Sequence, residues 1–203
     1  MASSIALLVI DVQEDYLNQE TLQPNRSESV ASIESAVSAA REAGFAVAHV
    51  RTLVSAEGEA VMPHRAASRR CVIGTPGAES PIQALSTEPI FGKAFFSSFS
   101  GGQLEAWLRA QGAKQLILVG GYTHACIRET ALEAYERGYS VSIVSDAIFS
   151  DRPSFALETL DWISTRAAQL VTVSDLAKLQ NSTPGNLDLS PTATAQLSWA
   201  AKP

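Results

Sequence analysis

Three residues of this sequence, Asp11, Lys93 and Cys126, have side chains that together support covalent hydrolysis. Each comes just after a short apolar segment that is typical of a buried strand. Reacting groups in parallel sheets gather beyond the carboxyl ends of the strands, so we expect these three side chains to converge. A thiol can attack a carbonyl carbon, and a carboxylate beside it can take the thiol proton and return it to a leaving nitrogen. The three residues therefore predict acyl transfer through a thioester.

The candidate nucleophile closes the segment Gly120-Gly121-Tyr122-Thr123-His124-Ala125-Cys126, which is typical of a strand-to-helix turn. The dipole at a helix N-terminus favours a thiolate over a thiol whose ordinary pKa is ~8.5. The ammonium of Lys93 would add to that stabilisation. Backbone N–H groups at the same turn are well placed to receive an oxyanion. We therefore expect a reactive thiolate beside an oxyanion site.

Each of these residues also has a purely structural interpretation. A single cysteine is often a small buried hydrophobe, an aspartate often caps a helix or turn, and a lysine is usually a solvated surface charge. The combination of all three at strand ends favours catalysis. Cys71 keeps the structural interpretation, because no acid or base accompanies it in the sequence.

The elements that must position these residues alternate between short apolar runs and helical patterns. The helical stripes comprise Val30, Ile33, Val37 and Ala40, then Leu104, Trp107 and Leu108, then Ile127, Ala131, Ala134 and Tyr135, and a last helix from about Pro153 with Leu157, Leu160 and Ile163. This alternation predicts an α/β fold, a three-layer, Rossmann-like arrangement with a central parallel sheet flanked by helices. We expect strands at 5–10, 45–50, 89–92, 115–119, 141–144 and 170–173.

Length and composition are those of one ordinary domain. The chain has 203 residues, of which 46% are hydrophobic, and a net charge of −6. The acidic balance argues against nucleic acid as a partner, and no apolar stretch is long enough to suggest a membrane span. Two cysteines are too few for a disulfide scaffold, so we expect a cytoplasmic protein. Residues 1–180 are predicted to form the domain, and 181–203 a low-complexity tail that is disordered or packs on a neighbouring subunit of a homo-oligomer.

Four motifs, spread over roughly residues 4 to 176, resemble the isochorismatase-like hydrolases, a superfamily that includes nicotinamidases, N-carbamoylsarcosine amidohydrolases, maleamate amidohydrolases and isochorismatases. Their order and spacing are more specific than any single motif. The motifs are Leu8-Val9-Ile10-Asp11-Val12-Gln13-Glu14-Asp15-Tyr16, Gly74-Thr75-Pro76-Gly77-Ala78-Glu79, Lys93 followed by Ser97, Ser98 and Phe99, and Gly120 to Cys126.

The resemblance implies that Cys126 is the nucleophile, Asp11 the general acid and base, and Lys93 their electrostatic partner. It also implies a cis peptide between Gly121 and Tyr122, with an oxyanion hole formed by the backbone N–H groups of Tyr122 and Cys126. By the same analogy, Gln13 braces the cis turn.

The resemblance further implies that Tyr16, Phe99 and Arg152 contact the substrate. Arg152 belongs to the run Ser150-Asp151-Arg152, which is similar to a Gly-Asp-Arg segment whose arginine can hold a substrate carboxylate in carbamoylsarcosine and maleamate hydrolases. Arg152 could instead be a solvated charge beside the next helix. A second possible source of positive charge is the irregular loop that contains His64, Arg65, Arg69 and Arg70.

Departures from the family pattern narrow the expected reaction. Isochorismatases that cleave a vinyl ether usually lack a cysteine at the position of Cys126, so its presence favours cleavage of a C–N bond. Nicotinamidases carry an Asp-x-His metal cluster after the second strand, whereas this chain reads His49-Val50-Arg51-Thr52-Leu53. No two of the histidines, His49, His64 and His124, have the short spacing of a metal motif. We therefore expect neither a metal nor another cofactor.

The sequence thus predicts a metal-free cysteine hydrolase that acts on a small amide or carbamoyl (ureido) compound. Two alternatives remain open at this point. One is a vinyl-ether hydrolase of the isochorismatase type, and the other is a non-catalytic relative that binds a ligand. The sequence does not specify the substrate or the oligomeric state.

Overall fold

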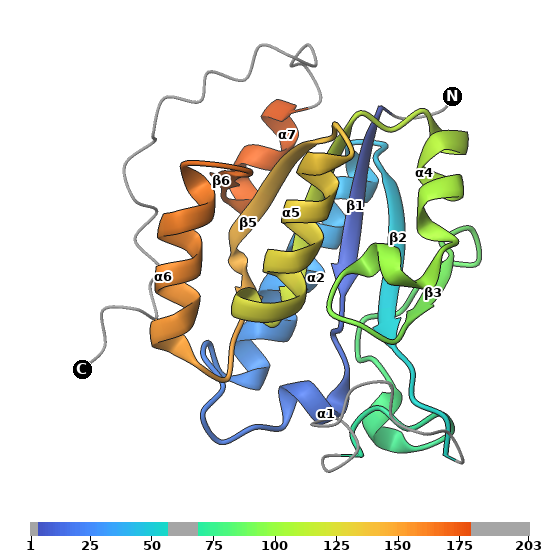
Figure 1. Ribbon diagram of the computed structural model, residues 1–203, viewed down its shortest axis with the longest axis vertical. Coiled ribbons are helices and arrows are strands. Elements are labelled where there is room, and N and C mark those ends of the chain that lie inside the picture. The colour runs from blue at the N-terminus through green and yellow to red at the C-terminus, as the bar shows by residue number, and fades with distance from the viewer. Residues whose placement is uncertain (1–3, 57–68, 180–203) are drawn as a thin grey trace.

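The computed structural model of this protein describes residues 4–56 and 69–179, and these form a sheet of parallel strands with helices on both faces (Figure 1). The sheet order is β3-β2-β1-β4-β5-β6. Parallel strands need crossover connections, which the intervening helices provide. The strands are β1 (Ile5–Ile10), β2 (Ala46–Thr52), β3 (Ile90–Lys93), β4 (Gln115–Gly121), β5 (Ser140–Phe149) and β6 (Gln169–Val171).

Two layers of helices bury the two faces of this sheet. The short helix α1 (Glu14–Leu17), together with α2 (Arg26–Glu42) and α7 (Leu176–Leu179), packs on one face. The other face is covered by α4 (Leu104–Gln111), α5 (Arg128–Glu136) and α6 (Pro153–Ser164). All six residues of β1 are buried, as expected for a central strand with helices on both sides.

The predicted three-layer α/β fold is confirmed, with differences in detail. Strand β5 is longer than expected and runs on to Phe149. Tyr135 and Leu157 were predicted to face the core, but they are 55% and 37% exposed, because Thr130 and Ala156 take the buried positions on their helices. The expected tail, 181–203, lies outside the described residues, and the homo-oligomer stays a prediction.

The strand order reverses between β1 and β4, and this reversal fixes where the site lies. The chain proceeds from β1 outward to β3, then returns to the other side of β1 to begin β4. Crevices at such switch points are the usual ligand sites of open α/β sheets. At this point a Cβ on Gly120 would lie 2.1 Å from the carbonyl oxygen of Ile10. Glycine is therefore required for β4 to pass so close to the end of β1.

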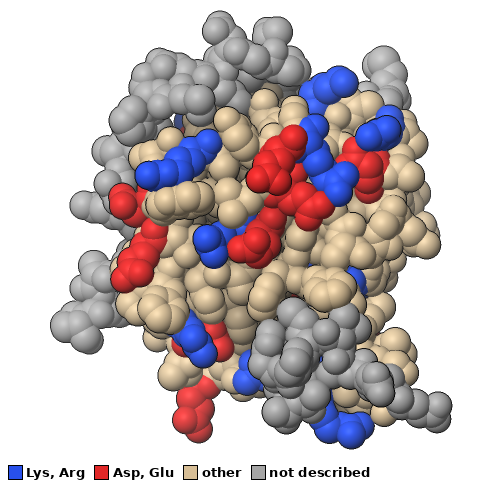
Figure 2. All heavy atoms as spheres, in the orientation of Figure 1, with Lys and Arg blue, Asp and Glu red and all other residues tan. Residues whose placement is uncertain are grey.

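Charged side chains of both signs are mixed over the face shown in Figure 2. Arg137, for example, forms ion pairs with Glu105 and Glu133. A mixed surface of this kind lacks the continuous basic strip that tracks a phosphate backbone. Among the described helices, none combines the length and apolar character needed to cross a membrane.

A partly buried charged cluster fixes the start of β3, the strand that ends in Lys93. Arg41 of α2 donates two hydrogen bonds of 2.8 Å to the carboxylate of Glu88, and Nε2 of His49 lies 3.1 Å from the same group. Burial alone would raise the pKa of Glu88, but the hydrogen bonds from Arg41, the Leu85 N–H and His49 outweigh it and lower the pKa to about 2. Glu88 thus stays ionised and holds α2, β2 and the entry to β3 together.

We expect this cluster to make the stability of the protein depend on pH. Because the pKa of Glu88 is lower in the folded state, its contribution is complete above about pH 4.5 and is lost as the pH falls toward 2. Glu88→Gln should lower the free energy of unfolding at pH 7 by about 2–3 kcal/mol and flatten its decline between pH 5 and 2. Urea unfolding at a series of pH values measures both effects. Glu34→Gln, which removes an exposed carboxylate of α2, is the control; equal acid slopes in wild type and Glu88→Gln would contradict the prediction.

Candidate active site

Asp11 is held at the end of β1 by hydrogen bonds to the neighbouring strand β2. Its backbone is left-handed, with φ of 50°, and its N–H donates to the carbonyl of Val50 at 2.8 Å. The carboxylate oxygen Oδ1 accepts from the N–H and the hydroxyl of Thr52, at 2.8 and 2.9 Å. The second oxygen, Oδ2, is left to face the other members of the site.

Lys93 joins the acid to the thiol. Its ammonium Nζ lies 2.7 Å from Oδ2 of Asp11 and donates to Sγ of Cys126 at 3.3 Å. It also donates to the carbonyl of Phe95 at 3.0 Å and to the hydroxyl of Thr52 at 3.2 Å. The Lys93 and Asp11 side chains are 0% and 1% exposed, so their charges interact with little screening by solvent. The three residues singled out from the sequence therefore meet in one buried cluster.

Cys126 lies in a π-helical turn, Thr123–Ile127, that leads from β4 into α5. Such turns are frequent at functional sites because they redirect a side chain within a helix. Burial raises the pKa of the Cys126 thiol above its ordinary value, and the carboxylate of Asp11 raises it further, while Lys93 acts in the opposite direction. Burial and the Asp11 carboxylate therefore oppose the expected thiolate, whereas the Lys93 ammonium favours it, and the thiolate stays a prediction.

The turn before the thiol has the cis peptide between Gly121 and Tyr122 that the family resemblance implied. The Tyr122 hydroxyl donates to the carbonyl of Tyr16 at 3.0 Å, and the two rings meet edge to face at 5.2 Å. Gln13 does not hydrogen-bond to this turn. Its amide instead joins Thr52 to the carbonyl of Ala78 in the loop after β2, with bonds of 2.9 Å.

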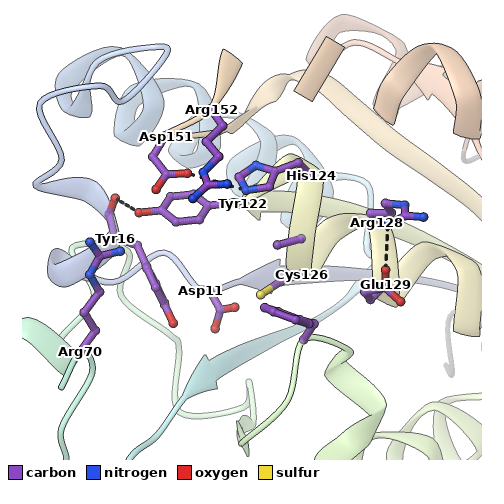
Figure 3. Close-up of a pocket in the computed structure, with 12 residues that line it drawn as sticks. Asp11, Tyr16, Arg70, Tyr122, His124, Cys126, Arg128, Glu129, Asp151 and Arg152 are labelled. Atoms are coloured by element: carbon purple, nitrogen blue, oxygen red, sulfur yellow. Dashed lines mark hydrogen bonds and ion pairs between the residues drawn. The ribbon is translucent and has the colours of Figure 1, made fainter. Parts of the chain in front are cut away.

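A cavity of about 400 Å³ opens in front of this cluster (Figure 3). Asp11 and Cys126 lie at its base, and Tyr16 and Arg152, whose role as substrate contacts stays a prediction, are among the residues that line it. Phe99 does not line this cavity. Its ring packs in the core against Tyr139, with ring centroids 6.2 Å apart, and the guanidinium of Arg137 covers it.

Sequence reasoning missed several residues of the site. Thr52 binds both Asp11 and Lys93, and its position at the end of β2 is a strand-end signal of the same kind as theirs. Phe96 lines the cavity in place of Phe99. The sequence could not distinguish Phe96 from Phe99, because the apolar residues after β3 have no regular spacing. Such spacing would have indicated which ring faces the cavity. The cavity also contains Arg70, His124, Ala125, Arg128, Glu129 and Asp151.

The described part of the chain offers no metal site of the nicotinamidase kind. The residues that follow β2 are Leu53 and Val54, whose apolar side chains carry no ligand atom. Across 4–56 and 69–179, no three His, Cys, Asp or Glu side chains gather closely enough to hold an ion. His64 and Arg65 lie outside the described residues.

A family model, described as the isochorismatase domain, matches residues 5–175. The chain belongs to the isochorismatase family. Members of this family are hydrolases, and none of the described residues of its site conflicts with that chemistry. A crystal structure of an isochorismatase family protein from Desulfovibrio vulgaris superposes with a TM-score of 0.80 at 28% identity, covering 88% of this chain and 99% of that one.

Two relatives within the isochorismatase family have names that indicate different activities. A ureidoacrylate amidohydrolase, RutB, of Stutzerimonas stutzeri is 26% identical over 186 residues, which cover 76% of this chain and 73% of the relative. A probable inactive nicotinamidase of Arabidopsis thaliana is 29% identical over 160 residues, which cover 73% of this chain and 82% of the relative. Family membership therefore establishes the hydrolase class and leaves the substrate to be argued from the site.

The raised pKa of the Cys126 thiol has a measurable consequence. We expect alkylation of Cys126 by iodoacetamide to be slow at pH 7 and to accelerate with pH up to at least pH 10, because the thiol stays protonated below its raised pKa. Asp11→Asn removes a carboxylate that raises this pKa, so alkylation at pH 8 should become at least several-fold faster than in wild type. Mass spectrometry of the peptide that contains Cys126 separates its labelling from that of Cys71. A fast, pH-independent reaction in wild type would show that the thiolate is already formed.

Proposed function

We propose that this protein is a metal-free cysteine hydrolase that cleaves a C–N bond of a small amide or carbamoyl (ureido) compound through a thioester intermediate. The observation that carries the proposal is the buried chain of contacts from Asp11 through Lys93 to Cys126, with lengths of 2.7 and 3.3 Å, at the base of a cavity. A cavity of about 400 Å³ is in the range that encloses small molecules.

In the proposed first half-reaction, the sulfur of Cys126 attacks the carbonyl carbon while Asp11 accepts the thiol proton. In this proposal proton transfer and attack occur together, because burial and the Asp11 carboxylate raise the pKa of the Cys126 thiol. The oxyanion that forms accepts hydrogen bonds from the backbone N–H groups of Tyr122 and Cys126. Asp11 then delivers the proton to the leaving nitrogen, the C–N bond breaks, and ammonia or an amine departs. The product left on the enzyme is a thioester.

The second half-reaction reverses the proton movements. Asp11, again a carboxylate, takes a proton from a water molecule as the water oxygen attacks the thioester carbon. Collapse of the intermediate breaks the C–S bond, and the proton on Asp11 returns to the sulfur of Cys126. Lys93 keeps its proton throughout, and its ammonium offsets the negative charge that moves between the carboxylate and the sulfur. The acid product leaves and the thiol is restored.

The nature of the leaving group favours C–N cleavage over cleavage of a vinyl ether. Nitrogen is a poor leaving group unless it is protonated. In the proposed mechanism Asp11 has become a carboxylic acid by accepting the thiol proton, and it can give this proton to the nitrogen. Ether cleavage driven by an acid has no need of a thiol. The amidohydrolase name of RutB agrees with the C–N alternative. Among the cavity residues, Tyr16 and Arg152 remain the proposed substrate contacts.

We expect each member of the cluster to be necessary for turnover. Cys126→Ala and Cys126→Ser should abolish ammonia release from a panel of amides, ureido acids and maleamate, while Asp11→Asn and Lys93→Ala should each cost at least ~10² in rate. The control is Cys71→Ala, which alters the other cysteine of the chain and should retain activity, with circular dichroism to verify folding. Hydrolysis that persists in Cys126→Ala would remove the thiol from the mechanism and favour the ether-hydrolase alternative. Absence of ammonia release from every compound in wild type would favour the non-catalytic alternative.

Activity should also survive exhaustive chelation. The proposed nucleophile is the sulfur of Cys126 itself, so no step requires a metal-bound water. The measurement is the rate of ammonia release after dialysis against EDTA, compared with a mock-dialysed sample. Loss of activity that added Zn²⁺ or Mn²⁺ restores would contradict a metal-free mechanism.

A further inference from the structure

Among the described residues, three arginines line the cavity, and their surroundings differ. Arg128 lies 3.3 Å from the carboxylate of Glu129, so its charge is already paired. Its guanidinium also lies over the ring of Trp162, 5.8 Å from the ring centroid. A cation with both an ion pair and a ring contact has less to gain from a ligand. Arg128 is therefore a poor anchor for a substrate.

Arg152 is a weaker candidate than its place in the family pattern implied. Its side chain is exposed, and its guanidinium lies over the ring of Phe155 at 5.8 Å. The neighbouring Asp151, which also lines the cavity, brings a negative charge to the same side. The nearby His124 does not balance that charge at neutral pH, because burial lowers its pKa in spite of Asp151. The net positive charge available around Arg152 is therefore small.

Arg70 is held toward the cavity by a neutral partner. Its Nη2 donates to Oε1 of Gln19 at 2.8 Å, and Nε2 of Gln19 donates to the carbonyl of Asp15 at 2.8 Å. The second bond fixes which end of the amide faces the arginine. Arg70 forms no ion pair with a carboxylate among residues 4–56 and 69–179. Its guanidinium is thus positioned without an ion pair, and a single hydrogen bond leaves most of the guanidinium donors for a ligand.

The backbone that carries Arg70 is fixed as firmly as its side chain. The N–H of the next residue, Cys71, donates to Oδ2 of Asp15 at 2.6 Å. The same carboxylate occupies the space where a Cβ on Gly77 would lie, which explains why the loop needs glycine there. Asp15 and Gln19, on and just after α1, therefore set the position of Arg70 relative to the cavity.

From this arrangement we propose that Arg70 binds a carboxylate of the substrate and determines specificity for anionic amides. The inference rests on the proposed function, since it assumes that the scissile amide lies at Cys126. Figure 3 shows Arg70 beside Tyr16, across the cavity from the Arg128 and Glu129 pair. The rings of Tyr16 and Tyr122 form the wall between the guanidinium and the reacting groups. A substrate bound in this way has its amide at the thiol, an apolar middle against the tyrosines and its carboxylate at Arg70.

Equilibrium binding tests this proposal without requiring turnover. The ligands are ω-amido acids and ureido acids of increasing chain length, each paired with the neutral diamide or ureido amide of the same length. Isothermal titration of Cys126→Ser should find at least one acid that binds roughly 10- to 100-fold more tightly than its neutral partner, as expected for a charge-assisted hydrogen bond. Adding Arg70→Gln should remove this preference, and adding Arg70→Lys should retain only part of it, because an ammonium lacks the planar fork.

Arg69→Gln is the matched control, since it removes the same charge from an exposed neighbour that does not line the cavity. It should leave the preference within about 2-fold. The proposal is overturned if no acid binds more tightly than its neutral partner, or if the preference survives in Arg70→Gln. Survival in Arg70→Gln with loss in Arg152→Gln would assign the anchor to Arg152. Failure of wild type to hydrolyse any amide, with the binding preference intact, would contradict the proposed function alone.

Discussion

The ion pair between Lys93 and Asp11 is the interaction on which the rest of the site depends. Two buried charges 2.7 Å apart are costly to desolvate, and such a pair is tolerated only where the remaining donors and acceptors are satisfied. Thr52 satisfies Oδ1 of the carboxylate, and the Phe95 carbonyl receives the ammonium. Gln13 in turn fixes the backbone of Thr52. The ends of β1, β2 and β3 are therefore held together by the contacts among Asp11, Thr52 and Lys93.

The raised pKa of the Cys126 thiol beside this ion pair bears on the proposed mechanism. A thiolate in this buried site would be a second negative charge, and the carboxylate of Asp11 opposes it. In the proposed mechanism, moving the proton from sulfur to carboxylate conserves the total charge of the cluster. The cluster thus suits the proposed transfer of a proton between the thiol of Cys126 and the carboxylate of Asp11.

The sequence was sufficient to predict the sheet and the convergence of Asp11, Lys93 and Cys126, because the period of apolar residues and the strand ends are local features. It failed where side-chain direction depends on neighbours that are distant in sequence. Phe96 faces the cavity and Phe99 faces the core, and the path of the chain after β3 decides which ring takes which place. The pKa of Cys126 could not be predicted from the helix dipole alone, since burial and the distance to Asp11 are properties of the folded chain. Tyr135 and Leu157 were misplaced because an apolar residue at the margin of a helical stripe can face solvent.

One short segment after β1 serves both the chemistry and the cavity wall. Gln13 fixes the strand that supports Asp11, and two residues later Asp15 fixes the loop that carries Arg70. Tyr16 then turns its ring toward Tyr122. Because these residues share a single turn of helix, a shift of that turn would move the reacting carboxylate and the binding arginine together. In the proposed binding mode, this segment sets the distance between the amide and the carboxylate of a bound substrate. The preference for a charged carboxylate depends on the side chain of Arg70 alone. Substrate preference can therefore change through Arg70 while the catalytic cluster stays as it is.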